Sequence, residues 1–308
     1  MVNLLINFTS NSVFQQLFGG SETLSQLADN WLNIFVVTFV LCFIIGELTN
    51  NLSQVDKVWS IMPIIYGFVT LSAFPDSPRI WLMTVLVTFW GLRLSYNFSR
   101  KGGYHIIPWK GEEDYRWAIL RENPLLKSRW RMMLFNLLFI SFYQQLLIML
   151  FSSPLLLAAK YADAQLVLTD YLAAAAMFGF ILIETIADNQ LFSFHLQKSK
   201  KKPADGRFDS SLKNGFMTDG LWKHVRHPNF AAEQAIWVSF YFFGIAASGT
   251  WLNWTIGGPV LLILLFLGSS DFTENISKSK YPAYEEYKKQ IPRFLPISSQ
   301  AFIRAAVE

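Results

Sequence analysis

The segment from Gly220 to Glu233, GLWKHVRHPNFAAE, gathers polar side chains directly before an apolar stretch. Arg226 and His227 can bind a phosphate or a carboxylate. The Asn229 amide can pair with a carboxamide, because it offers both an acceptor and a donor. A polar cluster of this density at a membrane surface predicts a bound ligand.

The same segment combines aromatic rings with the start of a helix. Trp222 and Phe230 can stack on a flat ring, and Pro228 suits the first helical turn, where free N–H groups would face the ligand. Glu233 follows one turn later, and an acidic group inside a membrane helix indicates function by default. The alternative is that the two basic residues meet lipid headgroups and that Glu233 caps the helix or pairs with an arginine.

A second polar cluster lies at the end of an apolar stretch near residue 191. Glu184, Asp188 and His195 share one helical face, because they are spaced by four and seven residues. The two carboxylates could bind ribose hydroxyls or a cation. The alternative is an ordinary polar helix end leaving the bilayer.

The first half of the chain offers a possible proton donor. Asp56 precedes an apolar stretch, and a carboxyl group with poor access to water has a raised pKa and can donate to a carbonyl oxygen. Arg93, Tyr96 and Arg100 follow at helical spacing. Arginine and tyrosine at such a position are typical of interfacial anchors.

The elements that position these residues are membrane helices. Hydrophobic residues make up 52% of the 308 positions and charged residues 16%, below the usual quarter. We predict an all-α polytopic membrane protein with seven spans, because a bilayer takes about 20 helical residues. The predicted spans are 31–49, 58–75, 80–99, 132–153, 168–191, 229–248 and 252–270.

The N-terminal 30 residues have no basic region typical of a cleaved signal peptide, so we expect residues 1–30 to form a surface segment. The single cysteine, Cys42, excludes an internal disulfide and a CxxC metal or redox site. We predict no metal site.

Basic residues set the orientation. They concentrate at 100–131, 198–226 and 278–293, which we therefore place on the cytosolic side, with the N-terminus outside and the C-terminus in the cytosol. The net charge of +4 reflects this bias, and no nucleic-acid module is recognisable. The expected location is a bacterial inner membrane or the endoplasmic reticulum.

The C-terminal tail carries a tyrosine repeat. Tyr281, Tyr284 and Tyr287 alternate with charged residues, which predicts an amphipathic helix lying on the membrane. Pro292 and Pro296 should end it.

Several sequence blocks together resemble the steroid 5α-reductase superfamily, and in particular its branch of steroid 5α-reductase-like membrane proteins. The blocks are RHPNF followed by AAE, DFTEN at 271–275, the tail from Tyr281 to Pro296, QVDKVWSIMP at 54–63, FWGLRLSYNFSRKGGY at 89–104 and GEEDYRW at 111–117. The resemblance covers about residues 50–296.

The resemblance implies a seven-helix bundle with NADPH bound from the cytosol and a steroid- or lipid-like substrate entering from the bilayer. The implied reaction reduces a carbon–carbon double bond conjugated to a carbonyl, and the enzyme stabilises the developing enolate. It also implies an N-terminal membrane half at 31–131 on the substrate side, a cofactor region at 132–296 and a tail at 297–308.

The implied catalytic residues include Asp56. Trp90 stands where the family has a catalytic tyrosine, so either Tyr96 supplies the missing hydroxyl or the substrate is not a 3-oxo steroid. The expected cofactor-binding residues are Glu184, Asp188, His195, Trp222, Arg226, His227, Asn229, Phe230, Glu233, Glu274 and Tyr281.

Two other functions are compatible with the sequence. Membrane methyltransferases of the isoprenylcysteine carboxyl type share an RHPxY segment and bind S-adenosylmethionine, but this chain has Phe230 for the tyrosine and Ala232 where a glycine is usual. The third possibility is a non-catalytic lipid-binding member of the fold. The oligomeric state is open.

Overall fold

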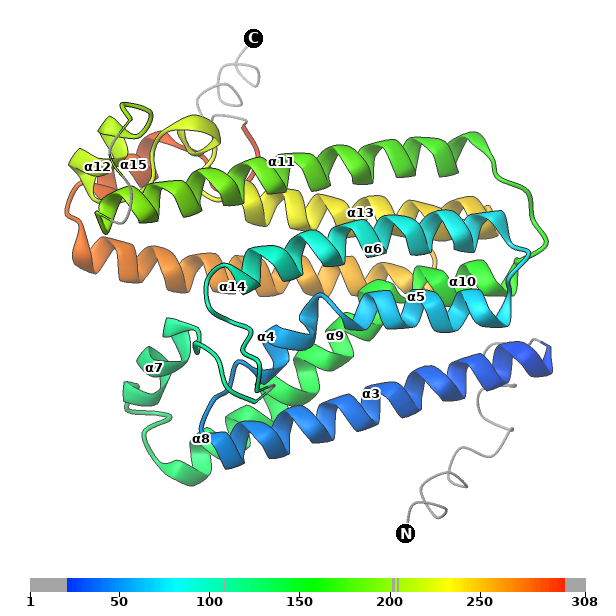
Figure 1. Ribbon diagram of the computed structural model, residues 1–308. Helices are drawn as coiled ribbons and strands as arrows, with labels where there is room; N and C mark the ends of the chain where they lie inside the picture. Colours follow the sequence, from blue (N-terminus) through cyan, green and yellow to red (C-terminus); the bar gives the residue numbers. More distant parts are fainter. Residues whose placement is uncertain (1–20, 108, 201–202, 204, 297–308) are drawn as a thin grey trace. The chain divides into compact units, whose positions relative to one another are not determined.

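In a computed structural model, residues 21–296 apart from 108, 201–202 and 204 form a helical chain, and no strand occurs within this part (Figure 1). The helices are α3 (Glu22–Thr49), α4 (Gln54–Trp59), α5 (Met62–Ala73), α6 (Pro78–Ser99), α7 (Tyr115–Glu122), α8 (Arg129–Phe135), the π-helix η1 (Asn136–Tyr143), α9 (Gln144–Ser152), α10 (Pro154–Lys160), α11 (Leu168–Lys198), α12 (Asp209–Asn214), the 3₁₀-helix η2 (Gly220–Lys223), α13 (Pro228–Ser248), the 3₁₀-helix η3 (Trp254–Ile256), α14 (Gly257–Lys280) and α15 (Tyr284–Gln290). The all-α prediction is thereby confirmed for the described residues.

The chain divides into two compact units. Unit 1 comprises residues 1–174 and 240–259, and unit 2 comprises residues 175–239 and 260–308. Unit 1 contains Asp56 and Trp90, whereas unit 2 contains Asp188 and Asn229.

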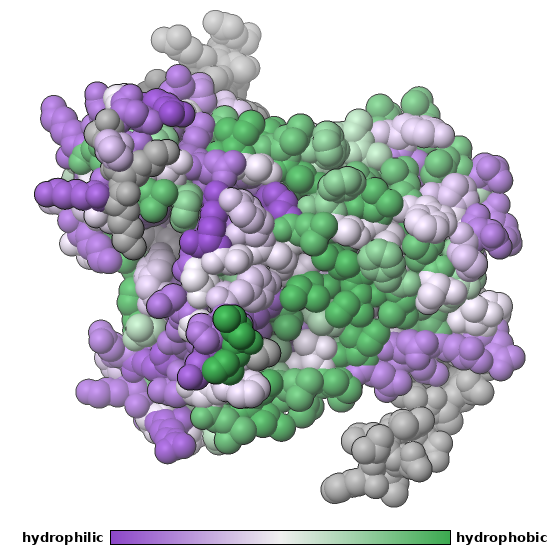
Figure 2. All heavy atoms as spheres, in the orientation of Figure 1, coloured by the Kyte–Doolittle hydropathy of each residue, from purple (hydrophilic) through white to green (hydrophobic). Residues whose placement is uncertain are grey.

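Among the described residues, five helical segments are long and apolar enough to cross a bilayer: Glu22–Thr49, Arg129–Ser152, Leu168–Lys198, Pro228–Ser248 and Trp254–Lys280. They coincide with five of the seven predicted spans. Figure 2 shows hydrophilic residues gathered over α12 and α15, and hydrophobic residues along the part of α11 beyond them. This distribution is compatible with an integral membrane protein.

The other two predicted spans correspond to α5 and α6. The chain leaves the helix after Trp59 and resumes at Met62 with Pro63 in the first turn, so α5 has only 12 residues. Helix α6 has 22 residues, but it is not among these five segments. One face of α6 nevertheless exposes large apolar or aromatic side chains: Trp81, Val85, Phe89, Leu92 and Tyr96.

The first long helix begins earlier than predicted. Ser21 caps α3 by accepting a hydrogen bond from the Leu24 N–H. The negative charge of Glu22 in the first turn interacts favourably with the positive end of the helix dipole. Residues 22–30, which we expected in a surface segment, are therefore helical. Residues 1–20 of that predicted segment lie outside the described part of the chain.

Close helix contacts and one ion pair hold unit 1 together. A Cβ atom on Gly91 of α6 would lie 2.5 Å from the Ser60 carbonyl oxygen, so the helix must approach that backbone closely. Arg79 and Asp170 form a buried ion pair at 2.8 Å. Since removing one partner of such a pair leaves a buried charge, this contact ties α6 firmly to α11.

Unit 2 has a separate core of Phe194, Phe208, Met217 and Trp222. The tyrosines of the tail also pack inside this unit, because the rings of Tyr281, Tyr284 and Tyr287 lie 5.0–5.7 Å from Phe216. The tail therefore packs on protein through these rings, and its helix α15 begins at Tyr284. As predicted, the helix ends before Pro292, at Gln290.

Candidate functional site

The candidate site in unit 2 begins with a carboxylate and an amide that are distant in sequence. The Asn229 Nδ2 atom donates to Asp188 Oδ1 at 3.3 Å. The Asn229 Oδ1 atom is also buried but accepts no hydrogen bond from the residues that the structure describes. Because a buried polar atom without a partner is costly, this oxygen can accept a hydrogen bond from a ligand.

The loop before α13 is fastened to α11 on both sides of Asp188. The Gln190 side-chain oxygen accepts from the Leu221 N–H at 2.9 Å, and Trp222 Nε1 donates to the Ala187 carbonyl at 3.4 Å. Gly220 has φ 63°, and a Cβ atom there would lie 2.5 Å from the Gln190 side chain. These contacts set where α13 starts and therefore where Asn229 lies.

Trp222 has a structural part in this arrangement. Its ring is buried in the core of unit 2, beside Phe194 and Met217. The prediction that this ring stacks on a ligand is therefore not favoured. The signal for its packing role was the neighbouring apolar residues Leu212 and Leu221, which lie against the same cluster.

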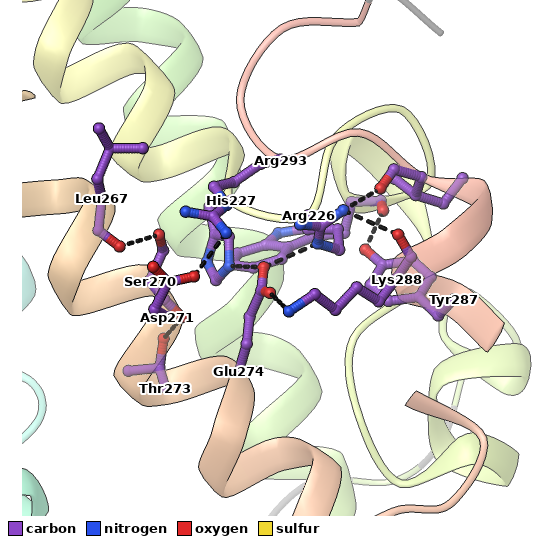
Figure 3. A network of polar contacts seen from close by, with 12 residues as sticks. Arg226, His227, Leu267, Ser270, Asp271, Thr273, Glu274, Tyr287, Lys288 and Arg293 are labelled. Atoms are coloured by element: carbon purple, nitrogen blue, oxygen red, sulfur yellow. Dashed lines mark hydrogen bonds and ion pairs between the residues drawn. The ribbon is translucent and has the colours of Figure 1, made fainter. Parts of the chain in front are cut away.

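Arg226 and His227 converge on one buried carboxylate (Figure 3). Glu274 Oε1 accepts from Arg226 Nε at 2.8 Å and lies 2.9 Å from His227 Nε2, while Lys288 Nζ lies 2.9 Å from the other oxygen. Glu274 is almost completely buried. We name these four residues the Glu274 cluster.

The Glu274 cluster fastens the tail to the start of α13. The N–H groups of Arg226 and His227 donate to the carbonyl oxygens of Pro292 and Arg293, and the Arg293 side chain pairs with Asp271. Arg226 also donates to the Lys288 and Ile291 carbonyls. Both predicted phosphate ligands thus have internal partners, which favours a role in positioning Asn229.

The remaining predicted cofactor residues of unit 2 lie in different environments. Glu184 is buried on α11, and the buried Glu233 accepts from Trp237 Nε1 at 3.1 Å. His195 is exposed near the end of α11. Phe230 stacks on His227 with ring centroids 5.4 Å apart.

Tyr281 is held at the edge of unit 2. Its hydroxyl accepts from Lys198 Nζ at 2.6 Å, and the same ammonium lies 4.7 Å from the ring centroid. This cation–π contact joins the end of α11 to the tail.

Asp56 forms the centre of a polar cluster in unit 1. Trp117 Nε1 donates to Asp56 Oδ2 at 3.2 Å and to Ser53 Oγ at 3.1 Å. Burial raises the pKa of Asp56, although the positive charge of Arg116 and hydrogen bonds from Ser53 and Trp117 oppose this effect. The raised pKa agrees with the expected proton donor.

Asp114 and Arg116 form the charged neighbour of Asp56. Burial opposes ionisation of Asp114, but two hydrogen bonds from the Arg116 guanidinium at 2.8 and 3.0 Å bring the pKa of Asp114 below its usual value. Burial disfavours the charged form of Arg116, but the Asp114 carboxylate raises the pKa of this arginine overall. The pair is therefore ionised, and Asp56 beside it favours its neutral form.

The aromatic residues of α6 differ from the expected arrangement. Trp90 is fully buried, whereas Tyr96 is 66% exposed and its ring lies under Arg100 at 5.5 Å. Six residues rotate a helix by about 600°, so the two side chains point about 120° apart. This geometry does not favour Tyr96 as a replacement for a hydroxyl at position 90.

Sequence reasoning missed Tyr104. Its hydroxyl donates to the Lys57 carbonyl at 2.8 Å and lies 3.4 Å from Ser60 Oγ, which itself lies 2.7 Å from Ser95 Oγ. Tyr104 is thus the tyrosine hydroxyl that contacts the backbone next to Asp56. The only sequence signal was its place in the SRKGGY block.

Comparison with known proteins gives a family but no activity. Residues 42–291 match the family described as "Protein of unknown function (DUF1295)". The "Uncharacterized protein C594.04c" of Schizosaccharomyces pombe is 37% identical over 298 residues, covering 91% of this chain and 84% of that protein. No solved structure matches.

Proposed function

The chain belongs to the DUF1295 family, and we propose that it is an integral-membrane, NADPH-dependent reductase of a carbon–carbon double bond conjugated to a carbonyl group. Its proposed substrate is a steroid- or lipid-like molecule. The resemblance of residues 50–296 to the steroid 5α-reductase superfamily supports this reaction class.

The single observation that carries the proposal is the buried Asn229 Oδ1 atom without a hydrogen-bond partner. The nicotinamide ring carries a carboxamide, whose N–H donates to an oxygen of this kind. Asp188 fixes the other side of the Asn229 amide. The residues present therefore fit the nicotinamide end of the cofactor, which supplies a hydride when bound.

The proposed proton donor lies in unit 1. Because burial favours neutral Asp56, its carboxyl can donate to the carbonyl oxygen of an enone as negative charge develops there. Trp117 and Ser53 hold the carboxyl in position. Tyr104, whose hydroxyl donates to the carbonyl of the next residue, Lys57, is the hydroxyl we assign to supporting this donor.

We propose seven membrane spans, with α5 and α6 added to the five apolar segments. The exposed apolar face of α6 supports its insertion, because a soluble helix rarely exposes such a stripe. The concentration of basic residues at 100–131 and 198–226 supports a cytosolic cofactor site.

Nucleotide binding tests the proposal directly. NADPH should raise the melting temperature of the purified protein in detergent, whereas S-adenosylmethionine should not, because only a ligand that binds the native state stabilises it. Asn229→Ala and Asp188→Ala should each weaken NADPH binding roughly tenfold or more, the cost of a lost hydrogen bond to a charged or buried group.

Asp209→Ala is the matched control, since Asp209 is an exposed carboxylate of the same unit. It should leave the NADPH-induced shift unchanged. Stabilisation by S-adenosylmethionine alone would instead favour the methyltransferase alternative, and stabilisation by neither would favour a non-catalytic lipid-binding protein.

A further inference from the structure

The second of the five apolar segments, Arg129–Ser152, is interrupted by the π-helix η1. Such segments are rare and frequently occur at functional sites. Asn136, at its start, donates to Glu47 at 2.7 Å and accepts from Ser141 at 3.0 Å. These side chains are thus bonded to one another.

Gln145, just after η1, is different. Its side chain is 0% exposed, and its Nε2 atom has one weak acceptor, the Cys42 Sγ atom at 3.7 Å. The Gln145 Oε1 atom is buried and accepts no hydrogen bond within the described part of the chain. A buried amide of this kind in a membrane segment costs free energy unless a further partner completes its hydrogen bonds.

The surroundings of Gln145 connect it to the proposed proton donor. Helix α9 packs against α3, which carries Cys42, and against α4, which carries Asp56. Gln145 therefore lies on a helix that packs against the helices carrying Cys42 and Asp56, all within unit 1.

We propose that Gln145 recognises a hydroxyl group of the substrate, so that the substrate class is a lipid with a hydroxyl in addition to its enone. A hydroxyl donates to an amide oxygen, which a carbonyl or ether cannot do. A charged group would meet a large desolvation cost in this buried region. This inference rests on the proposed function for the enone, while Gln145 itself supplies the evidence for the hydroxyl.

Cys42 offers a specific reporter, because it is the only cysteine of the chain and contacts Gln145. The experiment measures the rate at which methyl methanethiosulfonate modifies the full-length protein in detergent, by intact mass. The two probes are a 3-oxo-4-ene steroid with a 17-hydroxyl group and the same steroid without it. NADPH is omitted.

The hydroxylated steroid should slow modification of Cys42, and the deoxy steroid should require a roughly three- to tenfold higher concentration for the same effect, as expected for one hydrogen bond. Gln145→Leu should abolish this preference, whereas Gln145→Glu, which keeps an acceptor oxygen, should retain it. Gln144→Leu changes the neighbouring buried amide and should behave as the wild type.

Equal protection by both steroids, a preference that survives Gln145→Leu, or complete resistance of Cys42 to the reagent would each overturn the inference. The assay needs neither cofactor nor turnover. A protein that fails to bind NADPH but prefers the hydroxylated steroid would refute the proposed reductase and support the hydroxyl site. A protein that binds NADPH but shows no preference for the hydroxylated steroid would refute the hydroxyl site and leave the proposed reductase in place.

Discussion

At the residue scale, Asp56 and Asn229 show two ways of preparing a polar group for a ligand. Asp56 is held by Trp117 and Ser53 in a position where burial favours its neutral form. Asn229 is oriented by Asp188 and keeps a buried oxygen without a partner. The first group can give a proton, and the second can accept a hydrogen bond.

The raised pKa of Asp56 makes the stability of unit 1 depend on pH. Below the ordinary aspartate pKa of 3.8, Asp56 is neutral in both the folded and the unfolded chain. Above this pH the unfolded chain ionises Asp56 readily, whereas burial opposes its ionisation in the folded chain, so the folded state loses stability until the pH passes the raised pKa. Asp56→Asn removes this penalty. The melting temperature of Asp56→Asn minus that of the wild type should therefore increase as pH rises from about 4 to 8.

Differential scanning fluorimetry of both proteins across this range, without nucleotide, measures the difference. Asp209→Asn, at an exposed position, serves as the control. Its melting temperature minus that of the wild type should stay constant across this pH range. A constant difference for Asp56→Asn as well would show that Asp56 ionises normally.

Sequence chemistry placed Asp188 and Asn229 in two separate polar clusters, and only the resemblance to the steroid 5α-reductase superfamily assigned both to one cofactor site. It did not identify the internal partner of Arg226. Glu274 lies 48 positions away, and no local pattern encodes a contact over such a separation. Nor does sequence alone distinguish a tyrosine that faces α4, Tyr104, from one that is exposed, Tyr96.

At the element scale, helix ends decide where the functional side chains lie. Capping by Ser21 and the proline at position 63 leave local signals, and these signals explain the starts of α3 and α5. The π-helical turn before Gln145 leaves none. The start of α13 depends on the Glu274 cluster, which joins three elements of unit 2.

Removing the central carboxylate should loosen these elements. Glu274→Ala leaves the Arg226 charge buried without its partner, so we expect a loss of about 3–5 kcal/mol in the free energy of unfolding. Asp271→Ala is the matched control on the same helix: its ion pair with Arg293 is partly exposed and should contribute about 0–1 kcal/mol.

Denaturant unfolding monitored by tryptophan fluorescence compares the two variants, since Trp222 lies in the core of the same unit. If Glu274→Ala and Asp271→Ala lower the free energy of unfolding by similar amounts, the Glu274 cluster does not hold the tail. A small loss for Glu274→Ala would have the same meaning.

At the scale of the whole molecule, composition predicted an all-α membrane protein because apolar helices leave strong sequence signals. The number of spans is harder to derive, since α5 is shorter than a bilayer requires and α6 carries the buried Arg79. Partners such as Asp170 allow a charge to lie within a helix of this type.

The seven-span proposal places the two ends of the chain on opposite sides of the membrane. A reporter active only in the cytosol should give signal when fused to the C-terminus, and one active only outside the cytosol should give signal at the N-terminus. Exchanging the two reporters should abolish both signals. Signals that place both ends on one side would indicate an even number of spans.

Single-turnover oxidation of bound NADPH, followed by its absorbance on mixing with a panel of enone lipids, tests the central claim most directly. The account predicts that at least one enone oxidises NADPH and that Asp56→Asn slows this step by roughly a hundredfold or more, the usual contribution of a positioned proton donor, with little effect on NADPH affinity. Equal rates in the two proteins would remove Asp56 from the mechanism. No oxidation by any enone would contradict the proposed reductase.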